Sequence, residues 1–273
     1  MWRLPAILSR DTMYKQIIEQ FIAAQQAAHA AYVAAAAFER ESAAGIADHY
    51  HAVDVRSEYA TARELQSFCR SLASGVVNRA RREFAPQGSR LDIQDHDEHE
   101  RAGLDIDADL KAGGIPDIDG LWASLTVRYG GNGGADLAYQ QAAQRIVNGF
   151  GLNRKREVKK SASAVILRKH VGSEACFGRS ARRVGYYSQQ STADCLTGLA
   201  TFAAKAGHHV LANCLNRFNL HQLEYRYREK ECYPGLDIVF FKDAWEFKFS
   251  HQVADDLMLF IGEYGEAFMQ EVM

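Results

Sequence analysis

The sequence lacks the cysteine pattern of a disulfide-bonded or zinc-ribbon protein. Its five cysteines are odd in number, widely spaced, and include no Cys-x-x-Cys pair. Disulfide frameworks use even numbers of cysteines, and zinc ribbons use closely spaced cysteine pairs. The cysteines therefore predict a reducing compartment, for which the cytoplasm is the simplest choice.

Long apolar runs and an excess of one charge are also missing. No run is long enough to span a bilayer, and residues 1–10, interrupted by Pro5, are too short for a signal-peptide core. We therefore expect no membrane partner. The 32 basic and 34 acidic residues give a net charge of −2. This near-neutral total excludes a surface wholly devoted to polyanions, so a charge-driven partner must bind locally.

The chain does have 47% hydrophobic residues over 273 positions, enough for a sizeable core. Two stretches, at about 13–44 and 54–84, repeat apolar residues every three or four positions and are separated by a short polar connection at 45–52. This spacing predicts an antiparallel helical hairpin over residues 1–84. The same apolar seams also allow a homodimer or a host protein partner.

An acidic segment follows the predicted hairpin. Residues 85–119 contain ten acidic and three basic residues, a net charge of −7. Pro86 and Gly88 end the second helix, and residues 85–112 are predicted to be a polar connector. Apolar segments resume after it and predict an α+β domain over 113–273. The expected fold class is thus α+β, mainly helical, with the hairpin, the connector, and a domain ending in a β-hairpin and helix.

The elements of the predicted α+β domain follow from apolar spacing. Helices are expected at 121–129, 135–150 and 210–218, and a short strand at 164–167. Ser191 and Asp194 resemble a capped helix start. Alternating apolar and charged residues predict strands at 223–227 and 245–249, and a β-rich apolar run predicts one at 236–241. A final helix is expected from about 251 to 273.

The connector contains two motifs with the residue types of metal ligands. The first is composed of Asp92, Asp95, His96, Asp97, Glu98, His99 and Glu100. Consecutive acids are usually a solvated face, so we predict no metal site, and a metal-dependent nuclease or hydrolase using these acids with His96 and His99 is the enzymatic alternative. The second motif, three aspartates at 105–109, copies the start of a calcium loop, but Leu110 stands where that loop needs glycine.

No cofactor motif is recognisable, and we expect no cofactor. The glycine run at 130–134 lacks the lysine and Ser/Thr of a phosphate-binding loop. Five further residues have zinc-ligand types but match no compact spacing: Cys176, Cys195, His208, His209 and Cys214. No serine or cysteine is favoured as a nucleophile, because the partners of a nucleophile meet only in space.

The acidic segment is followed by a basic one. Residues 154–183 hold ten basic residues against two acidic ones, a net charge of +8. We predict that the ten bind nucleic acid, because affinity for a phosphate backbone comes mainly from charge neutralisation. They are Arg154, Lys155, Arg156, Lys159, Lys160, Arg168, Lys169, Arg179, Arg182 and Arg183. Phe177, Tyr186 and Tyr187 lie nearby for stacking. The alternative is that the basic segment pairs with the acidic one.

The C-terminal run LDIVFFKDAWEFKFSHQVADDLMLFIGEYG, residues 236–265, resembles the end of a domain family of unknown function. This family occurs in bacterial prophages, plasmids and genomic islands. The segment around 121–150 and the N-terminal hairpin also resemble it. The resemblance implies an accessory protein in a bacterial host cytoplasm that acts on nucleic acid, on host regulation or on host defence.

Together these observations predict a non-enzymatic protein of a phage or mobile element that binds nucleic acid or a nucleoprotein complex. A second hypothesis is an inhibitor of the anti-CRISPR type, whose acidic segment imitates a phosphate backbone and occupies a host protein. The metal-dependent enzyme is the third.

Overall fold

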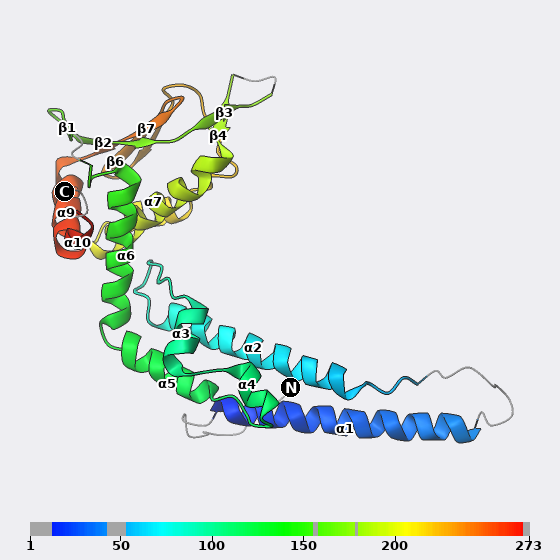
Figure 1. Cartoon of the computed structure of the whole chain (residues 1–273). Helices are drawn as coiled ribbons and strands as arrows, with labels where there is room; N and C mark the ends of the chain where they lie inside the picture. The colour runs from blue at the N-terminus through cyan, green and yellow to red at the C-terminus, as the bar shows by residue number, and fades with distance from the viewer. Residues whose placement is uncertain (1–12, 43–52, 155–157, 178–179, 270–273) are drawn as a thin grey trace. The chain divides into compact units, whose positions relative to one another are not determined.

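A computed structural model describes residues 13–42, 53–154, 158–177 and 180–269 (Figure 1). The fold is α+β and mainly helical, as predicted. The chain forms two compact units, each described here by itself: unit 1 comprises residues 1–83 and 93–130, and unit 2 comprises residues 84–92 and 131–273. The chain therefore changes unit at three points, after residues 83, 92 and 130.

Unit 1 is helical. Its elements are α1 (Met13–Ser42), α2 (Glu58–Glu83), α3 (Asp95–Ala102), α4 (Ile106–Lys111) and α5 (Ile118–Tyr129). The contacts between α1 and α2 run in opposite directions along the two helices. The Arg79 guanidinium donates to the Tyr14 hydroxyl at 3.0 Å, whereas Gln25 donates to the carbonyl of Thr61. This order confirms the predicted antiparallel hairpin (Figure 1).

The residues predicted as a connector instead contain helices α3 and α4. Two aspartates of the acidic segment 85–119 cap helices: the side chain of Asp105 accepts from Ala108 N at the start of α4, and that of Asp117 accepts from Gly120 N at the start of α5. Asp119 accepts from the backbone N–H groups of Tyr14 and Lys15 at 3.0 and 2.8 Å. Free N–H groups at a helix start favour such carboxylates, so part of the acidic segment is explained by helix formation.

Unit 2 combines helices with two antiparallel sheets. Its helices are α6 (Gly133–Phe150), α7 (Tyr186–Lys205), α8 (His209–Asn216), α9 (His251–Tyr264) and α10 (Glu266–Met269). Its strands are β1 (Lys159–Lys160), β2 (Val165–His170), β3 (Ser173–Ala175), β4 (Arg182–Val184), β5 (Lys230–Tyr233), β6 (Leu236–Phe240) and β7 (Ala244–Phe249). The larger sheet has the order β1-β2-β7-β6-β5, and β3 pairs with β4. The predicted β6–β7 hairpin is therefore present.

The core of unit 2 lies between the larger sheet and helices α6, α7 and α9. The ring of Phe150, at the end of α6, packs edge-on against Phe247 at 5.1 Å between centroids. Helices α6 and α7 approach closely because glycines stand at their crossing. A Cβ added to Gly198 meets the Ala142 carbonyl oxygen at 2.8 Å, and one added to Gly149 meets the Cys195 sulfur at 2.6 Å. Only glycine fits these positions without movement of the neighbours.

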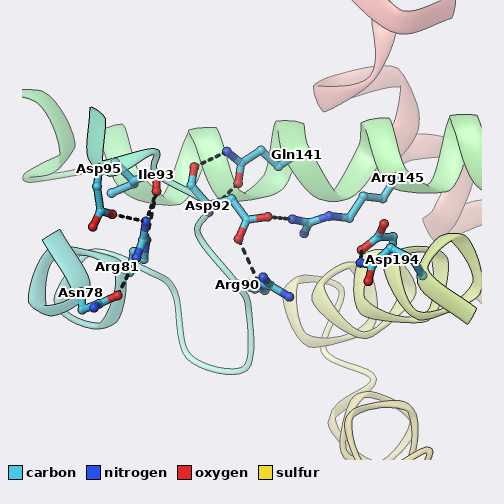
Figure 2. A network of polar contacts seen from close by, with 10 residues as sticks. Asn78, Arg81, Arg90, Asp92, Ile93, Asp95, Gln141, Arg145 and Asp194 are labelled. Carbon is cyan, nitrogen blue, oxygen red and sulfur yellow. Dashed lines mark hydrogen bonds and ion pairs between the residues drawn. The ribbon is translucent and has the colours of Figure 1, made fainter. Parts of the chain in front are cut away.

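A polar network fixes residues 84–92 onto α6 within unit 2 (Figure 2). The side-chain amide of Gln141 donates to the Asp92 carbonyl oxygen at 2.7 Å and accepts from its N–H at 2.9 Å. The Asp92 carboxylate accepts from the guanidinium groups of Arg90 and Arg145. A side-chain amide that pairs with both backbone groups of one residue acts as a strand partner, so this segment is held without a sheet.

Three predicted elements differ from those observed. Helix α7 begins at Tyr186, five residues before the predicted cap, and the Ser191 hydroxyl bonds to the Ser188 carbonyl inside the helix. The predicted strand at 223–227 contributes one bridge, between Tyr225 and Arg182, because a turn with Arg228 at φ 65° follows.

The predicted final helix divides at Gly265, and residues 270–273 lie outside the described residues. No helix of the described segments has the length and hydropathy needed to cross a membrane.

The glycine at the α6–α7 crossing gives a first prediction. Gly198→Ala should lower the free energy of unfolding by about 1–3 kcal/mol, because the new methyl group overlaps backbone that cannot move alone. Gly262→Ala is the control: it lies inside α9 with nothing within 4 Å of the added carbon, and should stabilise the protein by up to ~1 kcal/mol. Urea unfolding followed by circular dichroism measures both. Equal effects of the two substitutions contradict the close crossing.

Candidate nucleic-acid interface

The ten basic residues predicted to bind nucleic acid all belong to unit 2 by their position in the chain. Lys155, Arg156 and Arg179 lie outside the described residues. The other seven occupy three places: Arg154 follows α6, Lys159, Lys160, Arg168 and Lys169 lie on β1 and β2, and Arg182 and Arg183 lie on β4. Their side chains do not all lie on one face, because neighbouring residues of a strand point to opposite faces of the sheet.

Lys169 belongs to the core. It is 4% exposed and pairs in register with Trp245 of β7. Its Nζ lies 3.5 Å from the carbonyl oxygen of Gly149 in the last turn of α6, where carbonyl groups have no partner within the helix. A cation at this end also matches the helix dipole. Lys169 therefore stabilises the contact between α6 and the sheet and is not available to a ligand.

Arg182 also has a structural role. Its Nε donates to the Ser173 hydroxyl at 2.7 Å and its Nη2 donates to the Ser173 carbonyl at 2.9 Å. Its backbone exchanges two hydrogen bonds with Tyr225, of 2.8 and 2.9 Å. Arg182 thus joins β3, β4 and the segment before β5. The sequence predicts that Arg182 is a surface cation, but its guanidinium is hydrogen-bonded to Ser173 and stabilises the β3–β4 pair.

Of the seven predicted binding residues that the structure describes, five are exposed: Arg154, Lys159, Lys160, Arg168 and Arg183. Lys159 and Lys160 lie on β1, an edge strand of the larger sheet. Arg168 follows on the neighbouring strand and stands opposite Glu246 in register. Arg183 pairs with Glu174 at 3.2 Å between exposed groups, an arrangement worth little in water. These side chains are the part of the prediction that remains compatible with phosphate binding.

Charge is divided between the two units. By sequence, unit 1 has 13 basic and 18 acidic residues, a net charge of −5, whereas unit 2 has 19 and 16, a net charge of +3. Carboxylates of the acidic segment find partners inside unit 1. Asp95 pairs with Arg81 at 2.6 Å, and Asp107 pairs with Arg70 at 2.5 Å (Figure 2 for the first pair). Pairing with the basic segment is therefore not needed to explain them.

The acid and histidine motif at 92–100 is also used structurally. Glu98 is buried and accepts from the Tyr129 hydroxyl at 2.7 Å and from Arg101 at 2.5 Å. Burial beside this carboxylate raises the pKa of Tyr129 to about 12. Burial lowers the pKa of His99 from its ordinary value. Within the described segments, no group of three His, Cys, Asp or Glu side chains is placed to hold a metal ion.

The two other candidate ligand sets are dispersed as well. Asp105, the first residue of the calcium-like motif, caps α4, and the next two aspartates lie on that helix. Cys195 is fully buried, and burial raises the pKa of its thiol to about 12, so it is not a thiolate at neutral pH. His208 bonds to Asp256 at 2.8 Å. These residues serve helix capping and packing.

The structure also shows a groove that charge counting missed. Tyr186 and Tyr187, in the first turn of α7, are 75% and 97% exposed, and their rings are perpendicular with centroids 5.6 Å apart. They line a groove of about 720 Å³ together with Arg217, Phe218 and His221. These three residues follow α8, some thirty positions further along the chain. Sequence reasoning found the two tyrosines but had no signal for their distant neighbours.

Two adjacent residues of β2 give a second prediction. Lys169→Ala should lower the free energy of unfolding by about 2 kcal/mol or more, because it removes a buried methylene chain and a cation at a helix end. Arg168→Ala, on the exposed face of the same strand, should change it by less than about 1 kcal/mol. Urea unfolding separates the two. Similar losses at both positions contradict the burial of Lys169.

The partly buried histidine of α3, His99, gives a third prediction. Because folding lowers the pKa of His99, the unfolded chain binds the proton first as the pH falls below about 6.5. Stability should therefore decrease between pH 7 and pH 5.5, and His99→Gln should reduce this decrease. The control is His96→Gln, since His96 is exposed. Thermal unfolding across this range measures the effect, and an identical pH dependence in wild type and His99→Gln disproves it.

Comparisons with known proteins add no relative to this geometry. No protein-family model matches the chain, and searches of curated proteins and of solved structures find no match either. The resemblance to the prophage domain family therefore stays a prediction, and the functional argument rests on the site itself.

Proposed function

We propose that this protein binds nucleic acid through unit 2. The observation that carries the proposal is the group of exposed cations at the edge of the larger sheet. Lys159 and Lys160 lie on the edge strand β1, and Lys159 shares a sheet face with Arg168 of β2, because Lys159 pairs with Ile166 and side chains alternate along a strand. Exposed cations neutralise phosphates and release counterions. The net charge of +3 on unit 2 favours the same polyanionic class of ligand.

The β3–β4 pair supplies a further exposed cation to this unit. Arg183 lies on β4, next to Arg182, which fixes the pair to its surroundings. In Figure 1 the β3–β4 pair lies at the N-terminal end of α7. The first two residues of α7 are the exposed Tyr186 and Tyr187. Basic and aromatic side chains on neighbouring elements are a common composition for nucleic-acid interfaces. The proposal concerns binding, and it assigns no catalytic step.

The wider role implied by the resemblance is part of the same proposal. An accessory protein of a phage or mobile element that binds nucleic acid or a nucleoprotein complex fits a basic unit combined with a helical hairpin. The N-terminal hairpin of unit 1 is then available for a host protein or a second copy.

Charge reversal on the edge strand tests the proposal. Lys159→Glu/Lys160→Glu should weaken binding to labelled DNA and RNA oligonucleotides, and should reduce the slope of log K against log salt by about 1.4–1.8 for two lost phosphate contacts. These side chains are exposed, so the fold should be retained. Fluorescence anisotropy over a salt series measures both quantities.

The matched control is Arg63→Glu/Arg82→Glu, which makes the same charge change at exposed positions of α2 in unit 1. It should leave the salt slope unchanged. The proposal fails if the wild-type protein shows no salt-sensitive association with any DNA or RNA. It also fails if the control lowers the affinity as much as the edge-strand variant does.

A further inference from the structure

The groove between α7 and the segment after α8 has its own ligand chemistry. Its lining comes from Tyr186, Tyr187, Gln189, Gln190, Ala193, Leu196, Thr197, Leu215, Asn216, Arg217, Phe218, Asn219, Leu220 and His221. None of these described residues is acidic, although the whole chain contains 34 acidic residues. Arg217 and His221 are its basic side chains. The lining therefore attracts an anionic ligand, and it contains no carboxylate that would repel one.

Packing and hydrogen bonds position the elements on both sides of this groove. Leu196 and Leu215 are buried, so they anchor α7 and the end of α8 in the core below the groove. Arg217 continues the last turn of α8, with its N–H bonded to the carbonyls of Asn213 and Cys214. The side chain of Asn219 accepts from the N–H of His221 at 3.1 Å, which shapes the loop. The exposed groups thus project from fixed backbone.

The two tyrosines are placed for contact with a ligand and not for the core. Tyrosine is on average a largely buried residue, but Tyr186 and Tyr187 are 75% and 97% exposed. An exposed aromatic ring offers a flat apolar face, and bases of any identity stack on such a face. Side-chain amides at 189, 190, 216 and 219 offer donors and acceptors to base edges, beyond the hydrogen bonds that three of them make to Asp194, to the Gly88 carbonyl and to the N–H of His221.

We propose that this groove binds single-stranded nucleic acid, with unpaired bases stacked on Tyr186 and Tyr187 and the phosphate backbone near Arg217. The inference rests on the proposed nucleic-acid binding and deepens it. A duplex is disfavoured as the occupant, because its bases are stacked on each other and their faces are not accessible. The charge of the lining is complementary to single-stranded nucleic acid, because its basic side chains attract an anionic polymer and its amides can hydrogen-bond to that polymer.

Stacking is tested by fluorescence anisotropy with labelled single-stranded DNA, single-stranded RNA and a blunt duplex of the same sequence. Tyr187→Ala should lower the affinity for single strands by about 5- to 150-fold, the range for loss of one base-stacking ring. Tyr187→Phe keeps the ring and should bind within about twofold of wild type. The duplex should bind more weakly than either single strand and should not respond to these substitutions.

The matched control is Tyr227→Ala, an exposed tyrosine of unit 2 that does not line the groove. It should bind single strands as wild type does. The inference is overturned if the duplex binds as tightly as single strands, or if Tyr187→Ala and Tyr227→Ala behave alike. In both cases salt-sensitive binding that depends on Lys159 and Lys160 leaves the proposed function standing. Absence of binding to all three probes overturns both.

Discussion

The close crossing of α6 and α7 is the constraint on which unit 2 depends. Gly149 and Gly198 let the two helices touch through backbone, so their neighbours form one apolar surface. Phe150 at the end of α6 packs on the larger sheet, and Lys169 reaches back from that sheet to the same helix end. The position of α7 in turn decides where its first turn lies, and with it the exposed tyrosines of the groove.

Charged residues of the same type have different roles because the fold gives them different neighbours. Lys169 and Arg168 are adjacent in sequence, but one is buried at a helix end and the other is exposed. Arg182 and Arg183 repeat this contrast on β4. In unit 1, aspartates that look like a charged linker cap helices or pair with arginines. Net charge therefore distinguishes a basic unit from an acidic one, but it does not show which cations are exposed.

Much of the fold was predictable from the sequence, because it depends on local patterns. The helical hairpin follows from apolar spacing without proline, and the β6–β7 hairpin follows from alternation around a short turn. The acidic connector contains two short helices, α3 and α4, which its composition did not indicate because their charged residues resemble a solvated segment. The prediction of a strand at 223–227 was wrong, because alternation alone does not show that the segment forms a single β-bridge, at Tyr225.

The sequence by itself determined the class of this protein: mainly helical, α+β, and basic in the segment 154–183. Periodicity and composition are local properties, so they survive without knowledge of contacts. Only the tertiary structure decided which cations are exposed, and that the tyrosines at 186 and 187 share a groove with Arg217 and His221. These residues are about thirty positions apart and meet because packing of α7 against α8 brings them together, a contact that no local pattern encodes.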